Sequence, residues 1–135
     1  MAWGRLLRRI RMKMNLKRDV TIKQRDIDDI MAIALDGGIT YWCDRVEVVG
    51  GKYYGENASD QISRGGKLKL YDAEEDEQYT LTLTKLLKGI EAFIKWDRGD
   101  HEIVDRDGKI NVYNIDAEIT DQIIQLALFG EVIYG

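Results

Sequence analysis

The sequence contains no proline, one cysteine and one histidine among its 135 residues. The single cysteine, Cys43, cannot form an intrachain disulfide, and without a Cys/His cluster we expect no structural zinc. Nothing in the sequence places a serine or cysteine beside the single histidine, His101, so we expect no nucleophilic catalysis through a Ser–His or Cys–His pair. No phosphate-loop motif is complete either. We therefore expect a protein that is not an enzyme, with no catalytic residues, no cofactor and no metal site.

Long apolar runs are also missing from the sequence. No stretch approaches the roughly 18 residues of a membrane-spanning helix, and the N-terminus lacks the apolar segment of a secretory signal. A lone cysteine fits a reducing compartment, so we expect a cytoplasmic location. The hydrophobic content of 44% and the charged content of 33% are typical of a folded chain. The length suits a single domain.

Positive charge is concentrated at the N-terminus. Residues 1–25 carry nine Lys/Arg against one acid, whereas residues 26–135 carry eleven Lys/Arg against twenty-three acids. In residues 3–14, apolar side chains recur at spacings of three and four between basic ones, which predicts a short amphipathic helix. We interpret residues 1–14 as a basic N-terminal arm and residues 15–135 as one domain.

The arm has several possible roles. Its arginines, Arg5, Arg8, Arg9 and Arg11, are suited to the phosphates of a nucleic acid. The same segment could lie on an anionic membrane, or dock on the acidic body of a neighbouring copy and so form an oligomer. Because Met12 and Met14 are both plausible starts, the arm could also have no role. Without residues 1–13 the remainder carries about −9 and repels nucleic acid, so we expect nucleic acid to bind through the arm if at all.

Hydrophobic periodicity predicts three helices, over residues 24–36, 84–96 and 116–129. Thr84 and Asp116 are the expected N-caps of the second and third helices. Gly37-Gly38 is expected to end the first helix in the left-handed conformation, and Gly130 to end the last one. Gly89 is expected to allow a neighbouring element to approach the second helix closely.

Alternating apolar and polar residues predict short strands over residues 16–22, 45–49, 67–71, 78–83, 102–104, 109–113 and 131–134. The segments 67–71 and 78–83 should pair as a hairpin across an acidic loop, and 102–104 should pair with 109–113 across an Asp-Gly turn. A short helix is expected over residues 57–64. These elements predict an α+β fold, in which about three helices pack on a short-stranded, mostly antiparallel sheet.

Two clusters of acidic residues are candidate surfaces for binding a partner protein. The clusters consist of Asp26, Asp28 and Asp29 in the first predicted helix, and of Glu74, Glu75, Asp76 and Glu77 in the predicted hairpin loop. Carboxylates on such a surface can stand in for phosphates in the basic groove of a nucleic-acid enzyme. The alternative is that both clusters are solvated faces that aid solubility.

A glycine-rich segment between the second and third predicted strands carries a different set of side chains. Tyr53, Tyr54, Asn57 and Arg64 offer aromatic faces, an amide and a guanidinium group. That combination is suited to stacking on a nucleobase while pairing with a phosphate, which makes these residues candidates for binding a small nucleotide ligand. Alternatively, the two tyrosines are residues at the edge of a sheet.

Three stretches of the sequence, residues 26–43, 58–66 and 115–130, resemble small proteins carried by phages and prophages of Firmicutes-type bacteria. The resemblance covers residues 15–135 and leaves the arm outside. It implies a setting in the cytosol of a bacterial host, where such proteins are accessory factors that bind or disable host components, including defence systems. It implies no role for any single residue.

The leading hypothesis from the sequence is a non-enzymatic binding protein of phage type that inhibits a host protein. The nucleic-acid groove of a defence nuclease is a plausible target for its acidic surface. The alternatives are a protein that sequesters a nucleotide signal and a protein that binds nucleic acid through its arm. A homo-oligomer is compatible with all three hypotheses.

Overall fold

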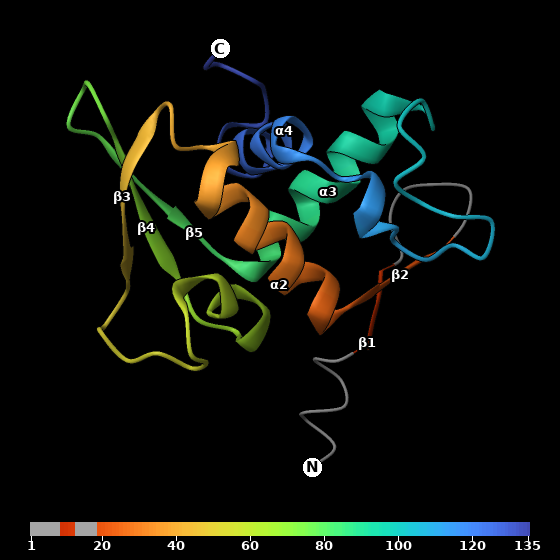
Figure 1. The fold of residues 1–135 in the computed structure, drawn as a ribbon, viewed down its shortest axis with the longest axis horizontal. Coiled ribbons are helices and arrows are strands. Elements are labelled where there is room, and N and C mark those ends of the chain that lie inside the picture. The colour runs from red at the N-terminus through yellow and green to blue at the C-terminus, as the bar shows by residue number, and fades with distance from the viewer. Residues whose placement is uncertain (1–8, 13–18) are drawn as a thin grey trace.

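The computed structural model describes residues 9–12 and 19–135, which form an α+β fold, as predicted (Figure 1). In chain order the elements are β1 (Arg9–Met12), β2 (Val20–Lys23), α2 (Gln24–Ile33), η1 (Ala34–Gly38), β3 (Cys43–Val48), η2 (Ala58–Asp60), η3 (Ile62–Arg64), β4 (Leu68–Asp72), β5 (Gln78–Leu81), α3 (Leu83–Asp97), η4 (Val112–Asn114) and α4 (Ala117–Phe129). Within these residues, no helix has the length and apolar character needed to cross a membrane.

The main sheet contains β3, β4 and β5 in that order, with antiparallel pairing throughout. The predicted hairpin is confirmed, because β4 pairs with β5 in a register that places Lys69 opposite Thr80. Residues on β4 alternate between buried and half-buried positions, so one face of the strand packs on the core. This alternation turns Leu68, Leu70 and Asp72 inward.

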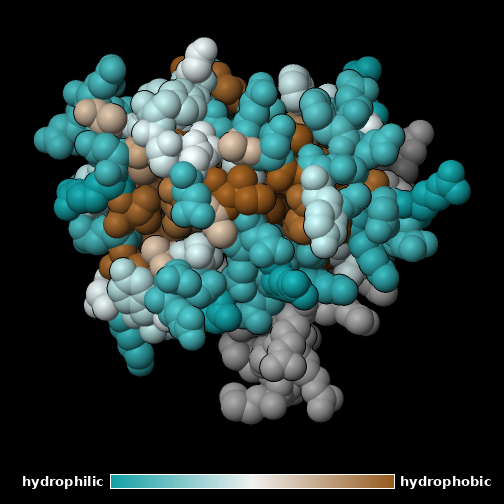
Figure 2. Space-filling model, viewed as in Figure 1, coloured by the Kyte–Doolittle hydropathy of each residue, from teal (hydrophilic) through white to brown (hydrophobic). Residues whose placement is uncertain are grey.

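The helices pack beside the sheet and enclose the core (Figure 1). The predicted role of Gly89 in α3 is confirmed, since a Cβ atom there would lie 2.5 Å from the carbonyl oxygen of Ile123 in α4. Figure 2 shows that apolar residues reach the surface near the middle of the viewed face, over α2 and the sheet, with hydrophilic residues around them. The core is therefore continuous from the sheet to the helices, and several of its apolar residues are only partly covered.

The first predicted helix ends differently from the prediction. The chain continues beyond α2 into η1, a single π-helical turn, and neither Gly37 nor Gly38 adopts a positive φ. A Cβ atom on Gly38 would overlap the hydroxyl of Thr120 and lie 2.8 Å from the carbonyl oxygen of Ala117. Gly38 is thus required because η1 approaches the start of α4 closely, not because the backbone turns left-handed.

The predicted N-caps can be compared with the observed starts of α3 and α4. Asp116 caps α4 as predicted, and Gly130 ends that helix with a φ of 73°. In α3 the predicted cap was wrong, because the hydroxyl of Thr82, not Thr84, accepts a hydrogen bond from the N–H of Lys85 (3.2 Å). The earlier start brings Leu83, which packs against the core, into the helix.

The helix predicted over residues 3–14 is wrong at residues 9–12, which form the strand β1. The strand pairs antiparallel with β2, from Arg9 opposite Lys23 to Met12 opposite Val20. The other edge of β2 is bonded to the turn at Gly108, whose carbonyl oxygen accepts from the N–H of Thr21 (2.7 Å). The turn at Gly108 leaves one edge of β2 open, and β1 supplies hydrogen-bond partners for the backbone groups of that edge. These hydrogen bonds outweigh the helical periodicity of the sequence. The rest of the predicted helix lies outside the described residues.

Two further regions that were predicted to form strands, residues 102–113 and 131–134, contain no regular strand. The turn at Asp107-Gly108 forms, with Gly108 at a φ of 78°, but only Val104 and Ile110 pair across it. Residues 131–134 also form no strand. Their backbone donors bind a side chain instead, since Gln125 Oε1 accepts from the N–H groups of Ile133 and Tyr134, both at 2.8 Å.

The predicted short helix over residues 57–64 is replaced by two successive 3₁₀ turns, η2 and η3. Gly65 then ends η3 in the left-handed conformation, with a φ of 86°. These turns pack against α2, which lies beside them in Figure 1. This packing brings the end of η3 close to the acidic side of α2.

Candidate functional site

The loop between β4 and β5 is held in place by one buried carboxylate. Asp72 Oδ1 accepts hydrogen bonds from the N–H groups of Glu74 (2.6 Å) and Glu75 (2.8 Å), and the N–H of Asp72 donates to the carbonyl oxygen of Glu77 (2.8 Å). Because these bonds fix the backbone of residues 73–77, the acidic side chains are presented from a defined turn.

The side chains of this acidic loop, which we define as Glu74, Glu75, Asp76 and Glu77, all lie exposed. Among the described residues, none of these four carboxylates forms an ion pair. The second predicted acidic cluster is therefore brought together at one place on the surface, with its charges available to a partner.

An open cavity of about 230 Å³ lies beside the acidic loop. Its lining includes three aromatic residues and three acidic ones, Tyr41, Trp42, Tyr134, Asp72, Glu74 and Glu75. The rings of Trp42 and Tyr134 are stacked, with their centroids 4.6 Å apart and their planes at 2°. The cavity therefore combines aromatic walls with carboxylates, a lining suited to a cationic group.

The aromatic wall of the cavity consists of Tyr41, Trp42 and Tyr134. Asp121 in α4 holds two of these residues, Tyr41 and Trp42, in place. Its carboxylate accepts hydrogen bonds from the indole N–H of Trp42 (2.8 Å), the hydroxyl of Tyr41 (2.6 Å) and the side-chain amide of Gln125 (2.9 Å). Asp121 and Gln125 are both buried, so the bonds from Trp42 and Gln125 are shielded from water, whereas the bond from the exposed Tyr41 is only partly buried. Burial and the bond to Asp121 raise the pKa of Tyr41 to about 12. Its hydroxyl therefore remains a donor at neutral pH.

Tyr134 connects the aromatic wall to the acidic loop. Its hydroxyl donates a hydrogen bond to Asp72 and lies 3.1 Å from the hydroxyl of Tyr79. Burial, with these bonds, raises the pKa of Tyr134. The same bond from Tyr134, together with the N–H groups of Glu75 and Glu74, lowers the pKa of Asp72. Asp72 is thus ionised at neutral pH and holds both the loop and the C-terminal segment.

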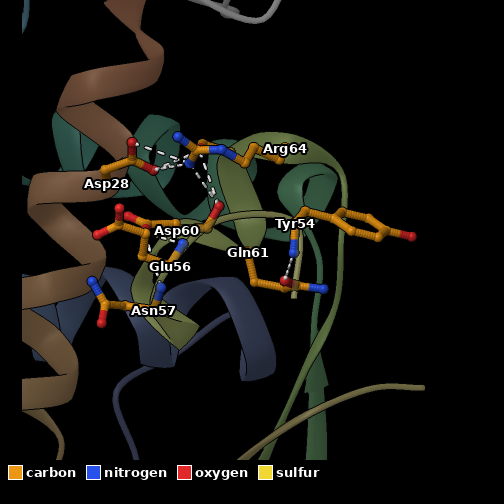
Figure 3. A network of polar contacts seen from close by, with 8 residues as sticks. Asp28, Tyr54, Glu56, Asn57, Asp60, Gln61 and Arg64 are labelled. Atoms are coloured by element: carbon orange, nitrogen blue, oxygen red, sulfur yellow. Dashed lines mark hydrogen bonds and ion pairs between the residues drawn. The ribbon is translucent and has the colours of Figure 1, made fainter. Parts of the chain in front are cut away.

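The first predicted acidic cluster, on α2, lies elsewhere and faces different partners. Asp28 accepts a hydrogen bond from the hydroxyl of Ser63 (2.5 Å). It also forms an ion pair with Arg64 (3.4 Å), which Figure 3 shows. Asp26 accepts from the backbone N–H of Lys23 (2.8 Å) at the start of α2. Burial raises the pKa of both Asp26 and Asp28. Asp29 is half-buried beside them.

The four residues predicted to bind a nucleotide do not converge on one pocket. The guanidinium group of Arg64 points toward Asp28 and also donates to the carbonyl oxygen of Asp60 (2.9 Å). The ring of Tyr54 points away from it (Figure 3). Tyr53 and Tyr54 are 53% and 51% exposed, and Asn57 is also exposed beside η2. Arg64 is therefore engaged within the fold.

Arg9 and Arg11 of the predicted nucleic-acid surface lie in β1, and Arg5 and Arg8 lie outside the described residues. His101 Nδ1 is hydrogen-bonded to the buried carboxylate of Asp97, and this bond raises the pKa of His101. Cys43 is buried, and burial raises its pKa. Across residues 9–12 and 19–135, no three His, Cys, Asp or Glu side chains are grouped to hold a metal ion.

Sequence reasoning missed the aromatic cavity and the carboxylate beneath it. Two local signals were present. Tyr41-Trp42 is an aromatic pair in an apolar stretch, and Asp121 and Gln125 are polar residues four positions apart on a helix rich in apolar residues. A polar pair on the buried stripe of a helix needs partners from elsewhere, and Tyr41 and Trp42 provide them.

Comparisons with known proteins matched no family model, no curated protein and no solved structure.

Proposed function

We propose that this chain is a non-enzymatic accessory protein of phage type that binds and inhibits a host protein through the acidic loop. The observation that carries the proposal is the presentation of the carboxylates of Glu74, Glu75, Asp76 and Glu77 from a turn fixed by Asp72, without ion pairs among the described residues. A fixed set of unpaired charges favours association with a basic surface, both in rate and in specificity.

The two acidic clusters differ in how well they support this function. On α2, Asp26 and Asp28 already accept hydrogen bonds from the fold. Among the described residues, the carboxylates of the acidic loop have no such partners, and the loop lies at one end of the molecule (Figure 1). Its Glu74 and Glu75 line a cavity together with Tyr134 of the C-terminal segment. A basic groove, such as that of a nucleic-acid enzyme, could therefore reach the loop without disrupting internal contacts.

The nucleotide-binding alternative receives less support from the geometry. The cation that would pair with a phosphate, Arg64, is bound to Asp28 and Asp60. A nucleotide would have to displace these contacts and leave Asp28 without its ion pair, at a cost of roughly 1–3 kcal/mol. No comparable cost opposes binding at the acidic loop.

The test is capture of a partner from a susceptible bacterial host at low salt, with the full chain and two charge variants. The first variant replaces Glu74, Glu75 and Glu77 by glutamine. The matched control changes three exposed acids at the opposite end of the molecule, Asp100→Asn, Glu102→Gln and Asp107→Asn. We expect mass spectrometry to identify a host protein that is recovered with the native chain and the control and lost with the loop variant.

Equal recovery of that protein with the loop variant would contradict the acidic loop as the binding surface. Recovery of no host protein above background would contradict the function itself.

A further inference from the structure

We propose that the cavity beside the acidic loop receives the guanidinium group of one arginine side chain from the partner protein. This inference rests on the proposed function and names the chemistry of its partner. The juxtaposition that carries it is an aromatic wall, formed by Tyr41, Trp42 and Tyr134, that lines the same cavity as Glu74 and Glu75.

The size of the cavity favours a side chain over a complete small molecule. Sites for metabolites and similar ligands usually enclose about 300–1,000 Å³, whereas this cavity measures about 230 Å³. A nucleotide or a folded peptide segment could not enter as a whole. One side chain reaching in from a partner's surface fits the space.

The polar groups of the cavity require a ligand that donates hydrogen bonds. Asp72 already accepts from Tyr134 and from two backbone N–H groups, and the hydroxyl of Tyr41 already donates to Asp121. The carboxylates of Glu74 and Glu75 have no ion-pair partner among the described residues. The site therefore has acceptors to fill and its phenolic donors are in use, which selects a cation over an anion.

The aromatic wall distinguishes a guanidinium group from an ammonium group. A planar guanidinium stacks on aromatic rings and donates two parallel hydrogen bonds to a carboxylate, whereas an ammonium is a compact and strongly hydrated charge. A cation over the ring of Tyr41, which is 54% exposed, gains further electrostatic attraction from the ring. Arginine meets the aromatic and the acidic sides of the cavity at once.

The cavity is also held in shape before any ligand arrives. Asp121 fixes the side chains of Tyr41 and Trp42, and Gln125 fixes the backbone of Ile133 and Tyr134. Little side-chain entropy of the aromatic wall remains to be lost on binding, so even a small site can contribute specificity.

The test is an NMR titration of the full native chain with three pentapeptides that differ at one position. One has a central arginine between glycines, the second has citrulline, which keeps the shape and removes the charge, and the third has lysine, which keeps the charge and removes the planar group. We expect the arginine peptide to shift the amide signals of Glu74, Glu75 and the indole N–H of Trp42. The citrulline peptide should bind at least about 10-fold more weakly, because charge-assisted bonds are lost.

Two charge variants serve as matched tests in the same titration. The variant E74Q/E75Q removes two carboxylates that line the cavity and should weaken the arginine peptide about 10-fold. The variant D76N/E77Q removes the same charge from the same loop but outside the cavity, and it should leave the affinity within about 2-fold. Asparagine tolerates the positive φ of 56° at residue 76, so the turn is kept.

The inference is overturned if the arginine peptide leaves the cavity signals unmoved, if citrulline binds equally well, or if a lysine peptide matches arginine. If the peptide fails but capture of a host protein still depends on the acidic loop, only the arginine pocket is wrong. If the peptide binds as expected and no host protein is captured, the pocket stands and the proposed function falls.

Discussion

The acidic cluster on α2 and the acidic loop look alike in the sequence and behave differently in the fold. Asp28 on α2 faces Ser63 and Arg64, which the 3₁₀ turns bring within hydrogen-bond distance. Glu74 and Glu75 face solvent, because the backbone donors of their loop are bound by Asp72 and no element in the described part of the chain covers them. The comparison teaches that a run of acids becomes a candidate binding surface only where no neighbouring element neutralises it.

The comparison predicts the largest loss of stability where a carboxylate is fully enclosed. Asp121→Ala would remove the acceptor for Tyr41, Trp42 and Gln125 and leave a buried indole N–H without a partner. We expect the free energy of unfolding to fall by about 3 kcal/mol. Urea unfolding followed by circular dichroism measures it, and a loss below about 1 kcal/mol would show that the network does not hold the fold.

A smaller loss is expected on α2, where the carboxylate is partly exposed. Asp28→Ala removes the bonds from Ser63 and Arg64, and we expect a cost of about 1.5 kcal/mol. Asp29→Ala is the matched control, with the same change of charge one residue away, and should stay within about 0.5 kcal/mol. Equal losses for the two variants would show that the bonds from Ser63 and Arg64 do not set Asp28 apart from Asp29.

The pH dependence of stability separates Asp72 from the acidic loop that it holds. The pKa of Asp72 is lowered from about 3.8 in the unfolded chain by Tyr134 and the loop backbone. Its contribution is therefore complete above that unfolded value and is lost as the pH falls through the lower, folded value. In urea unfolding from pH 7 to pH 3, Asp72→Asn should be less stable than the native chain at pH 7, and the difference should shrink toward pH 3. A constant difference would contradict the assignment.

The smallest effect on stability is expected for the side chains of the acidic loop itself. Replacing Glu74, Glu75 and Glu77 by glutamine should change the free energy of unfolding by less than about 0.5 kcal/mol, since these exposed carboxylates form no ion pair within residues 9–12 and 19–135. Thermal unfolding checks this. A loss above about 1 kcal/mol would mean that the loop is structural and would weaken the case for a binding surface.

Those parts of the fold whose signals are local could be predicted from the sequence. The hairpin of β4 and β5 follows from alternation on both sides of one loop, and α4 follows from a cap at Asp116 and a stop at Gly130. Prediction failed where distant residues decide the conformation. β1 is a strand because β2 has an open edge, and Gly38 is required by the approach of Thr120.

The candidate site was predictable in part. The acidic loop was recognised from its composition, and the structure brings its four acids together. The aromatic cavity was not, because Tyr41 and Asp121 are 80 residues apart and neither carries a local sign of the other. Arg64 and Asp28 form an ion pair across 36 residues of sequence. For the same reason, Arg64 was assigned to the nucleotide-binding hypothesis and Asp28 to the acidic-surface hypothesis.

Because Tyr134 stacks on Trp42, the cavity cannot be completed until late in the synthesis of residues 1–135. At a synthesis rate of about 5–20 residues per second, Tyr134 leaves the ribosome roughly 5 to 20 s after Tyr41. During that interval α2 and the sheet can form, but Trp42 lacks its stacking partner and Asp72 lacks its bond to Tyr134. We therefore expect the aromatic wall of the cavity to be completed only after translation has passed α4 and Tyr134 has emerged.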